Sequence, residues 1–468
     1  MLAPYAKAVA RMRELSITEP KSWARQAAMH GTSAPNPPTL ANGCKHLSWF
    51  FLSWHRMFLY YFESIVHAAV IEEGGPEDWA LPYWNYGLGG EHATLPEAFR
   101  HERVDGKDNP LYVKQRAPEI NGGGELDPAI ISPNPALDMR HFTGPADFGG
   151  GEGPPEEQFW SEPGAVERTP HNDIHGAVGG RGGWMNNPFE AAQDPIFWLH
   201  HANIDRIWAL WNKEGNTNPT DREWASRKFP FFDATGTQVA RSASEVLDTV
   251  GDLGYTYDKL ERDPVAAVEE VAGPTVMAAS VEDAGGGMGP RSPQQPEIVG
   301  GSERPVRLVG APEQVSVRID RRASDAAQAR SASDEPPRVL LHLDDIEAEE
   351  NPGSVYAIYV NLPSDADAAE RAAHHAGNLS FFGIEHANRP PGDEHPHGLR
   401  LSMDITGLAN RLRGRGEWSD DALQVSLLPV GVQPAPDDGG ATAAEAGTVE
   451  RRHDDLPVTV GRVSVSYA

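Results

Sequence analysis

The most constraining stretch of the chain is CKHLSWFFLSWHRMFLYYFE, residues 44–63, an apolar and aromatic run that also carries two histidines, an arginine and a glutamate. Apolar residues recur at helical spacing from residue 49 to residue 73, which predicts a helix that packs in a core. A polar side chain in such a helix needs a partner, because an unpaired polar group is costly to bury. We therefore expect His46 and His55 to meet either hydrogen-bond partners or a metal.

Composition limits the classes of protein to consider. The 468 residues are too many for one ordinary domain, so two or three are expected. The net charge of −28 argues against nucleic acid and anionic membranes as partners. The one cysteine, Cys44, excludes an intrachain disulfide, and no run approaches the roughly 20 apolar residues of a membrane helix. The first residues lack the apolar core of a signal peptide, so we expect a cytoplasmic protein, with export by a partner left open.

The first part of the chain, residues 1–261, is predicted to be mainly helical. Helical spacing covers residues 5–15, 49–73 and 194–214, and long loops rich in Gly and Pro join these segments. Asp194 and Pro195 suit the start of the third helix, as the capping residue and the first-turn proline.

The rest of the chain changes character twice. Residues 262–303 are small, acidic and rich in Gly and Pro, which predicts a flexible linker. Residues 304–468 have a period of two, which predicts a C-terminal all-β sandwich or barrel domain. Residues 433–455 are expected to form an exposed acidic loop before the last strand. The predicted strands are 314–320, 338–346, 354–362, 423–430 and 458–468.

Several histidines of the first part have the spacing of metal ligands. His171 and His175 stand four apart in PHNDIHG, which on a helix places both imidazoles on one face. One such pair arises easily by chance among 18 histidines, so alone it is a weak sign. WLHHANIDRIW adds His200 and His201, with Asp205 placed to orient a ligating ring. For each histidine alone, the alternative is a buried ring that only satisfies hydrogen bonds.

Together the histidines form an early set and a later set. Six neutral imidazoles, without a set of thiolates or carboxylates, suit copper better than zinc. Such a site tolerates both Cu(I) and Cu(II), and apolar surroundings keep water from the positions that dioxygen would take. The two sets are His30, His46 and His55, then His171, His175 and His201.

These residues resemble the type 3 dinuclear copper family, which comprises tyrosinases, catechol (polyphenol) oxidases and molluscan-type hemocyanins. One signature runs from His46 through FLSWHRMFLYYFE to Glu63, the other is DPIFWLHHANID, and PHNDIH lies between them. The resemblance implies a mainly α catalytic domain over residues 1–261, with a four-helix bundle around a dicopper centre and irregular loops. It makes His201 the ligand of the HH pair and His200 a neighbour of the ligands. The implied ligands are His30, His46 and His55 for copper A, and His171, His175 and His201 for copper B.

The resemblance also implies roles for other residues. In fungal tyrosinases and molluscan hemocyanins, a cysteine two residues before the second copper A ligand bonds to that ring, which implies a thioether from Cys44 to His46; the alternative is a buried thiol. The water-activating pair of the family corresponds to Glu167 and Asn172 in VERTPHN, although Glu167 could equally be an ordinary surface carboxylate. Gly176 adds no side chain at the pocket mouth, which is expected to leave it open.

The last part resembles, more loosely, the β-rich C-terminal domain of plant-type polyphenol oxidases, through SVYAIYVNL, GNLSFFGIEHA and VTVGRVSVSY. In relatives such a domain covers the copper site, so a lid is expected here, and cleavage within 262–303 is expected to raise activity. The histidines of this part are predicted to be surface residues rather than ligands: His374, His375, His386, His395 and His397.

The implied activity is oxidation of o-diphenols to o-quinones, with ortho-hydroxylation of monophenols. Two copper ions are the expected cofactors, O2 the co-substrate and small phenols the partners. One alternative is a hemocyanin-like oxygen carrier, although a single copper unit with a plant-like second domain favours the enzyme. Another is a zinc hydrolase, but HxxxH here lacks the glutamate of HExxH, since Ile174 precedes His175. The natural phenol and the oligomeric state are left open.

Overall fold

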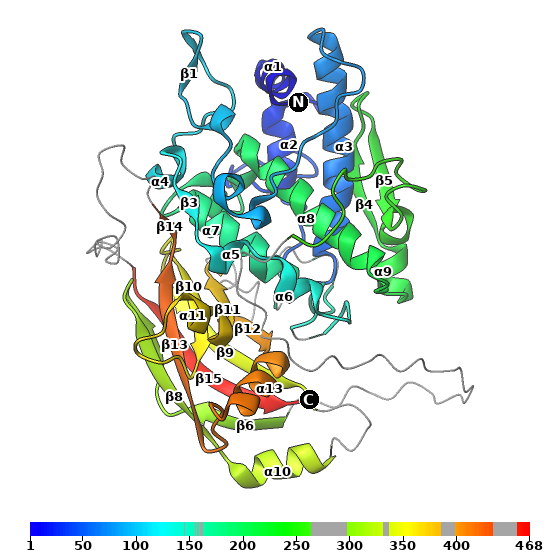
Figure 1. Ribbon diagram of the computed structural model, residues 1–468. Helices are drawn as coiled ribbons and strands as arrows, with labels where there is room; N and C mark the ends of the chain where they lie inside the picture. Colours follow the sequence, from blue (N-terminus) through cyan, green and yellow to red (C-terminus); the bar gives the residue numbers. More distant parts are fainter. Residues whose placement is uncertain are drawn as a thin grey trace.

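The chain folds into a helical unit and a β-rich unit that pack against each other, as seen in a computed structural model (Figure 1). The structure describes residues 1–468 except 145, 155, 157–158, 160–161, 264–296, 331–336, 385–397 and 434–455. Most of the predicted linker and nearly all of the predicted acidic loop therefore lie outside the described residues.

Three long helices form the frame of the helical unit. α1 (Leu2–Arg13) packs against α3 (Phe51–Glu72), and α3 packs against α8 (Pro195–Lys213). All three confirm the predictions from apolar spacing. Two shorter helices, α2 (Trp23–His30) and α7 (Asp173–Gly179), lie beside this frame. Among the described helices, none is long and apolar enough to cross a bilayer.

Short elements fill the connections of the helical unit. The helical turns are η1 (Tyr86–Leu88), η2 (Gly90–Ala93), η3 (Glu97–Phe99), α4 (Pro118–Asn121), α5 (Pro128–Ile131), α6 (Asn134–Leu137), η4 (Glu167–Asn172), η5 (Trp184–Asn186), η6 (Ala191–Gln193), α9 (Arg222–Ser226) and η7 (Ala243–Val246). The strands are β1 (Arg103–Val104), β2 (Lys107–Asp108), β3 (Glu125–Leu126), β4 (Lys228–Phe232) and β5 (Gln238–Ser242).

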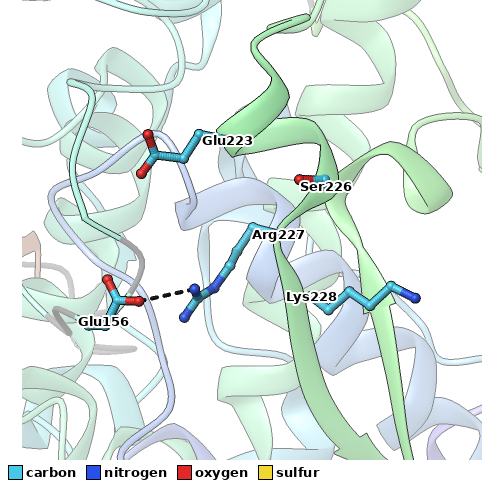
Figure 2. A pocket seen from close by; sticks show the side chains of 5 residues that line it. All are labelled: Glu156, Glu223, Ser226, Arg227 and Lys228. Atoms are coloured by element: carbon cyan, nitrogen blue, oxygen red, sulfur yellow. Dashed lines mark hydrogen bonds and ion pairs between the residues drawn. The ribbon is translucent and has the colours of Figure 1, made fainter.

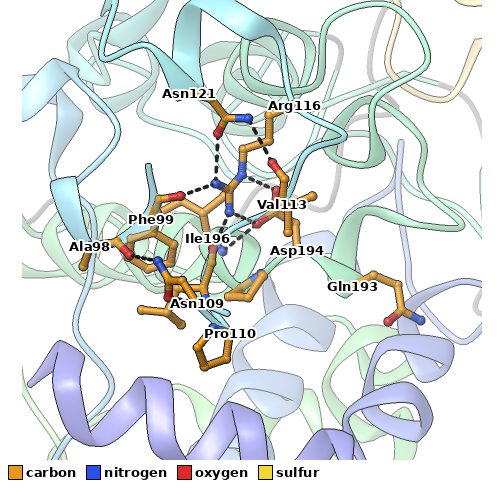
Figure 3. Close-up of polar contacts among 12 residues, drawn as sticks. Ala98, Phe99, Asn109, Pro110, Val113, Arg116, Asn121, Gln193, Asp194 and Ile196 are labelled. Carbon is orange, nitrogen blue, oxygen red and sulfur yellow. Dashed lines mark hydrogen bonds and ion pairs between the residues drawn. The ribbon is translucent and has the colours of Figure 1, made fainter. Parts of the chain in front are cut away.

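A buried ion pair holds the start of α8 (Figure 3). The Asp194 side chain caps the helix by accepting from the Ile196 N–H at 3.0 Å, which confirms the predicted helix start. Two nitrogens of Arg116 donate to the Asp194 carboxylate, each at 2.7 Å, and both side chains are fully buried. The remaining Arg116 donors reach the carbonyls of Phe99 and Leu111. The cap of α8 is thus tied to the preceding loop.

A second buried ion pair joins α3 to α8. Arg56 Nε donates to Asp205 Oδ1 at 2.5 Å, and the Arg56 guanidinium lies 3.7 Å from the Trp208 ring centroid. The hydroxyls of Tyr255 and Tyr257 both donate to Asp205 Oδ2 at 2.5 Å. These three side chains are the described partners of the Asp205 carboxylate, and His201 Nδ1 has no partner among the described residues, so the structure gives no support to the prediction that Asp205 orients a ligating ring.

One nine-stranded sheet forms the β-rich unit, in the order β11-β10-β13-β8-β6-β15-β9-β12, with β7 paired to β15. The end strands β11 and β12 contact each other, so the sheet curves into a barrel-like wall. All five predicted strands are present. The strands of this unit are β6 (Glu297–Ser302), β7 (Val306–Leu308), β8 (Glu313–Ile319), β9 (Val339–Ala348), β10 (Val355–Val360), β11 (His375–Ser380), β12 (Leu399–Asp404), β13 (Ala422–Val430) and β15 (Val458–Tyr467), and β14 (Val432–Gln433) pairs with β3 of the helical unit.

The β-rich unit is not all-β. Within the described part of this unit, three helices accompany the sheet: α10 (Arg321–Arg330), α11 (Ala368–His374) and α13 (Thr406–Arg415). The prediction missed them because it followed the period of two alone. α11 carries a local signal that could have found it, a capping box between Asp367 and Glu370.

The predicted linker is too long at both ends. Asp263 is buried and accepts from Arg206 and Asn85, each at 2.8 Å, so it belongs to the helical unit. Residues 297–302 form β6, which pairs with β15 and β8. This pairing satisfies the hydrogen-bonding groups of the backbone, although the composition of the segment predicts a flexible linker.

The prediction that the histidines of the β-rich unit are surface residues is wrong for two of them. His374 is buried, and its Nδ1 donates to the Val360 carbonyl at 2.8 Å. His375 is half-buried, with its Nε2 2.9 Å from Asn378 Oδ1. Neither belongs to a group of metal-type donors among the described residues. His386, His395 and His397 lie outside those residues.

The two units exchange side chains across their interface. Val355 and Phe382 of the β-rich unit belong to the hydrophobic core of the helical unit, and Leu47 of the helical unit belongs to the core of the β-rich unit. Arg338 forms an ion pair with Asp147 across the interface at 2.7 Å. Docking of the units is therefore part of the packing of each core.

We predict that Arg116→Met destabilises the protein by about 3–5 kcal/mol, because it leaves the buried Asp194 carboxylate without its charged partner. Chemical denaturation of the purified variant measures the loss. Arg103→Met is the matched control, since Arg103 is 64% exposed and its ion pair with Asp108 should contribute less than about 1 kcal/mol. Equal stability of the two variants would contradict the role given to Arg116.

Candidate metal centre

The six predicted ligand histidines meet at one place inside the helical unit, and all are buried. One ends a short helix, one lies in a loop and four lie inside helices or helical turns, so their sequence neighbourhoods have little in common. His30 ends α2, His46 lies in the loop before α3, His55 lies in α3, His171 in η4, His175 in α7 and His201 in α8.

Ring spacing within each of the two predicted sets is compatible with a shared metal, although one donor group, His30, His55 and His201, spans both sets. In the first set, His30, His46 and His55, the ring centroids lie 5.1–5.5 Å apart. Two rings that bind one metal through nitrogen at ~2.0 Å, at a tetrahedral angle, have centroids about 5 Å apart. The second set has centroids 4.5–5.5 Å apart, and comprises His171, His175 and His201.

The two sets also contact each other. The rings of His55 and His201 stack with centroids 4.6 Å apart, and those of His46 and His171 lie 5.7 Å apart. A pair of metal ions held by the two sets would therefore be neighbours.

Hydrogen bonds to Nδ1 orient four of the rings. An imidazole whose Nδ1–H is engaged keeps its Nε2 lone pair for a metal. Asn172 Oδ1 accepts from His171 at 2.9 Å. Backbone carbonyls serve the other three rings: Pro188 for His30 at 2.9 Å, Phe51 for His55 at 2.8 Å, and Met185 for His175 at 2.5 Å.

Ring nitrogens at the centre fit a metal. The Nε2 atoms of His175 and His201 face each other at 3.3 Å, about the separation of two nitrogens bound at ~2.0 Å to one tetrahedral metal. An unpartnered buried polar atom costs free energy, and a bound metal would remove that cost. Atoms without a hydrogen-bond partner among the described residues include both ring nitrogens of His46 and the Nε2 of His55 and of His171.

The imidazoles are neutral, as ligands must be. Burial lowers the pKa of His30 to about 3. Burial also lowers the pKa of the other five well below the ordinary value, and neighbouring imidazoles add to this effect. Their lone pairs are therefore available at neutral pH.

Cys44 lies beside the first set. It is buried, and one ligand-type atom each of Cys44, His30 and His46 lies within 4.8 Å of the others. The tertiary structure thus brings the sulfur close to the ring to which the predicted thioether would join it.

Glu167 is fully buried, so it is not the ordinary surface carboxylate of the alternative interpretation. Its two carboxylate oxygens accept from the Leu47 N–H at 2.8 and 3.0 Å, and burial raises the pKa of Glu167 well above its usual range. Leu47 directly follows His46 and has a φ of 56°. Glu167 therefore links the turn that carries His171 to the loop that carries His46.

A fourth imidazole lies beside the second set. His200 is buried, and its donor atom lies within 4.8 Å of those of His171, His175 and His201. Its Nδ1 is 3.2 Å from the Tyr86 hydroxyl. This position agrees with the prediction that His200 is a neighbour of the metal ligands.

Sequence reasoning missed Phe382, which comes from the β-rich unit. Its ring stacks on His175 with centroids 4.2 Å apart and lies 5.5 Å from His46 and 5.6 Å from His171. The adjacent Phe381 packs into its own unit's core. The sequence offers two neighbouring phenylalanines and no sign of which one crosses to the histidines.

The prediction that Gly176 leaves the pocket mouth open is wrong. A Cβ at this position would lie 3.0 Å from Val355 Cγ2 and 3.2 Å from Ser380 Oγ, both in the β-rich unit. The missing side chain instead allows the β-rich unit to approach α7 closely.

A separate surface cavity of about 500 Å³ lies elsewhere on the molecule (Figure 2). An ion pair of 3.0 Å between Arg227 and Glu156 crosses it. Its lining contains none of the predicted site residues and consists of Glu156, Glu223, Ser226, Arg227 and Lys228.

Three family descriptions match successive parts of the chain. "Common central domain of tyrosinase" matches residues 20–148 and 143–214, which include all six histidines. "Polyphenol oxidase middle domain" matches residues 218–265. Residues 295–440 match a domain described only as being of unknown function.

Whole-chain comparisons agree with these matches. The latent form of the chloroplastic polyphenol oxidase of Prunus armeniaca is 26% identical over 100% of this chain and 73% of its own length. The solved structure of latent aurone synthase, a polyphenol oxidase, matches 100% of this chain and 87% of its own with a TM-score of 0.65 at 19% identity. Latent apple tyrosinase matches 100% and 94% with a TM-score of 0.62 at 23% identity. At these identities the solved structures support the fold.

A bacterial relative gives the strongest of these likenesses in sequence. Tyrosinase HcTyr1 of Hahella sp. (strain CCB-MM4) is 30% identical over 99% of this chain and 96% of its own length. The family implies a dinuclear copper centre, and the buried histidines have the donors for one. Because the likeness extends along both units and includes the motifs that bear these histidines, the chain belongs to the tyrosinase and polyphenol oxidase family of type 3 copper enzymes.

Proposed function

We propose that the protein oxidises o-diphenols to o-quinones with O2, and hydroxylates monophenols at the ortho position, at a pair of copper ions. One observation carries the proposal. Two sets of three buried, neutral imidazoles meet, and several of their ring nitrogens have no partner among the described residues. Such a donor set favours copper over a hard, oxygen-seeking metal.

The helices position the histidines that would bind the two copper ions. In this proposal α2, α3, α7 and α8 serve as a four-helix bundle around the centre. Carbonyl and amide acceptors at Nδ1 fix the ring orientations before metal arrives, which lowers the cost of binding. Copper A would be held by His30, His46 and His55, and copper B by His171, His175 and His201.

When bound, the copper pair supplies the electron exchange with O2 that phenol oxidation requires. Each o-diphenol loses two electrons and two protons, so two o-diphenols reduce one O2 to two waters. The chain's residues must exclude bulk water and admit an aromatic ring. Phe51 packs on His171 at 4.6 Å and Phe197 on His201 at 4.1 Å between centroids, so the walls of the site are aromatic.

Monophenol hydroxylation needs a base, because the pKa of a phenol is near 10. The proposal gives Glu167 and Asn172 the task of activating a water that accepts the phenol proton. Burial raises the pKa of Glu167, so its ionised form is a stronger base than an ordinary carboxylate. Asn172 lies in the same turn and already accepts from His171.

The β-rich unit acts as a lid in the same proposal. Phe382 is 3% exposed and lies against rings of both sets, where a phenol would have to enter. Displacement of this side chain is then a condition for turnover.

An oxygen carrier would need the same imidazoles, but the relatives named above are enzymes. Incubation of the copper-loaded protein with catechol separates the two functions. Quinone absorbance supports the enzyme, whereas reversible O2 binding without turnover supports the carrier. A zinc hydrolase leaves the first set of histidines without a role, and one zinc per chain in metal analysis would favour it.

We predict that His55→Ala or His201→Ala removes one of the two coppers and abolishes catechol turnover, because each variant leaves two imidazoles in its set. Metal analysis and quinone absorbance measure the two effects. His101→Ala is the control, since the His101 side chain is 63% exposed and outside the donor groups. Retained copper and turnover in either test variant would refute the assignment of ligands.

Copper loading in air should lower the intact mass of the chain by two hydrogens. The thioether forms when the Cys44 sulfur and a ring carbon of His46 each lose a hydrogen, with O2 as the oxidant that the proposed activity uses. Intact-mass spectrometry of the wild type and of Cys44→Ser as control measures the change. An unchanged mass with a thiol that still reacts with an alkylating reagent after unfolding would refute the bond.

Phe382→Ala should raise catechol turnover several-fold without changing copper content, because it clears the rings while leaving the ligands in place. Steady-state assays at equal copper loading measure the effect. Turnover equal to that of the wild type at full copper content would count against Phe382 as the covering residue.

A further inference from the structure

The β-rich unit forms hydrogen bonds with the segment that bears the second set of histidines. Asn378, in β11, is fully buried, and its Nδ2 donates to Asp173 Oδ2 at 2.8 Å and to the Ala129 carbonyl at 2.8 Å. Asp173 lies between His171 and His175 in the sequence. A side chain of the β-rich unit therefore reaches the side chain of a residue that lies between two of the proposed ligands.

Other contacts from the β-rich unit end on the same segment. Ser380 Oγ donates to the Asn172 carbonyl at 2.9 Å, and Asn172 in turn accepts from His171 Nδ1. Arg168 of η4 donates to the Ser402 carbonyl at 2.7 Å. The turn η4 and the start of α7 are thus held from the β-rich side.

Asp173 depends on these contacts. Its carboxylate is fully buried, and Oδ2 accepts from Asn378 and from Thr169 Oγ1, both at 2.8 Å. Its Oδ1 has no hydrogen-bond partner among the described residues. Loss of the Asn378 amide would leave the carboxylate with one hydroxyl donor, and a poorly satisfied buried carboxylate is expected to rearrange the turn around it.

The first set of histidines has its own connection to the β-rich unit. Leu47 is 4% exposed and belongs to the hydrophobic core of the β-rich unit, although it directly follows His46. Its positive φ and the bond from its N–H to Glu167 fix this arrangement. Both ligand segments therefore have a neighbouring residue anchored in the other unit.

We propose that the β-rich unit is a structural part of the metal centre as well as a cover, and that Asn378 is a positioning residue that acts through Asp173 on the His171–His175 segment. The inference rests on the proposed function, because it concerns retention of copper. A cover alone limits access of substrate. A positioning role requires that loosening this contact weakens the hold on copper B.

The test uses the full chain carrying Asn378→Ala, loaded with copper and then challenged with a chelator. We expect one of the two coppers to leave about 10-fold faster than from the wild type, the lower end of the loss in metal affinity typical when a partner of a metal ligand is removed, because Asn378 acts through Asp173. The second copper should leave at the wild-type rate. Metal analysis at successive times measures both rates.

Arg338→Gln is the matched control. It breaks an ion pair of 2.7 Å with Asp147 of the helical unit and one of 2.7 Å with Asp404 of its own unit, and neither partner lies in the His171–His175 segment. If general loosening of the interface were the cause, both variants would release copper faster. Accelerated release in Asn378→Ala alone supports the positioning role, and equal release from the two variants overturns it.

Amide hydrogen exchange of the metal-free protein gives an independent readout. Residues 171–176 should exchange faster in Asn378→Ala than in the wild type or in Arg338→Gln, because the turn loses its anchor even without copper. Unchanged exchange would contradict the inference. If Asn378→Ala fails to fold, Ser380→Ala removes only the bond to the Asn172 carbonyl and provides the same comparisons.

Failure of the inference can be told from failure of the proposed function. Two coppers in the wild type, with unchanged release from Asn378→Ala, would refute the positioning role and leave the copper enzyme intact. A wild-type protein that takes up no copper would refute both the positioning role and the proposed function.

Discussion

The burial of imidazole nitrogens that have no hydrogen-bond partner in the described part of the chain is the constraint on which the rest of this structure depends. Such atoms are costly in a protein interior unless a ligand satisfies them. Here they cluster, their Nδ1 partners orient them, and ring spacings match those of rings that share a metal. Aromatic packing around them keeps the imidazoles neutral, which is the state that binds copper.

Two buried ion pairs hold helices α3 and α8 in place, and these helices carry two of the clustered histidines. Arg116 and Asp194 fix the start of α8, and Arg56 and Asp205 fix its middle against α3. α3 carries His55 and α8 carries His201, one histidine of each set, so the ion pairs hold the two elements that bring these rings together. Sites on rigid elements keep their geometry better than sites on loops, and the four charged side chains are largely shielded from water.

The β-rich unit has two relations to the same centre. Phe382 lies on the rings, and Asn378 and Ser380 hold the turn that bears two of them. These residues are neighbours on and just after β11, so a single strand both covers and supports the site. Removal of the unit would then have opposite effects, easier entry for a phenol and a weaker hold on the metal. Each unit also buries hydrophobic side chains in the core of the other, and this burial stabilises the arrangement in which the two units are in contact.

Local pattern determined much of this protein. Apolar spacing places α3 and α8, Asp194 and Pro195 mark the start of a helix, and a period of two marks the strands, because each depends on residues close together in sequence. The histidines of the candidate site are also readable, since long motifs surround most of them.

Only the tertiary structure decided the partners. The contacts of Asp205 with Tyr255 and Tyr257, of Phe382 with His175, and of Asn378 with Asp173 join residues far apart along the chain. Gly176 likewise faces Val355 rather than an open mouth. The physical reason is that a sequence pattern specifies which face of an element is apolar or polar, whereas the group that meets that face depends on how whole elements and units pack together.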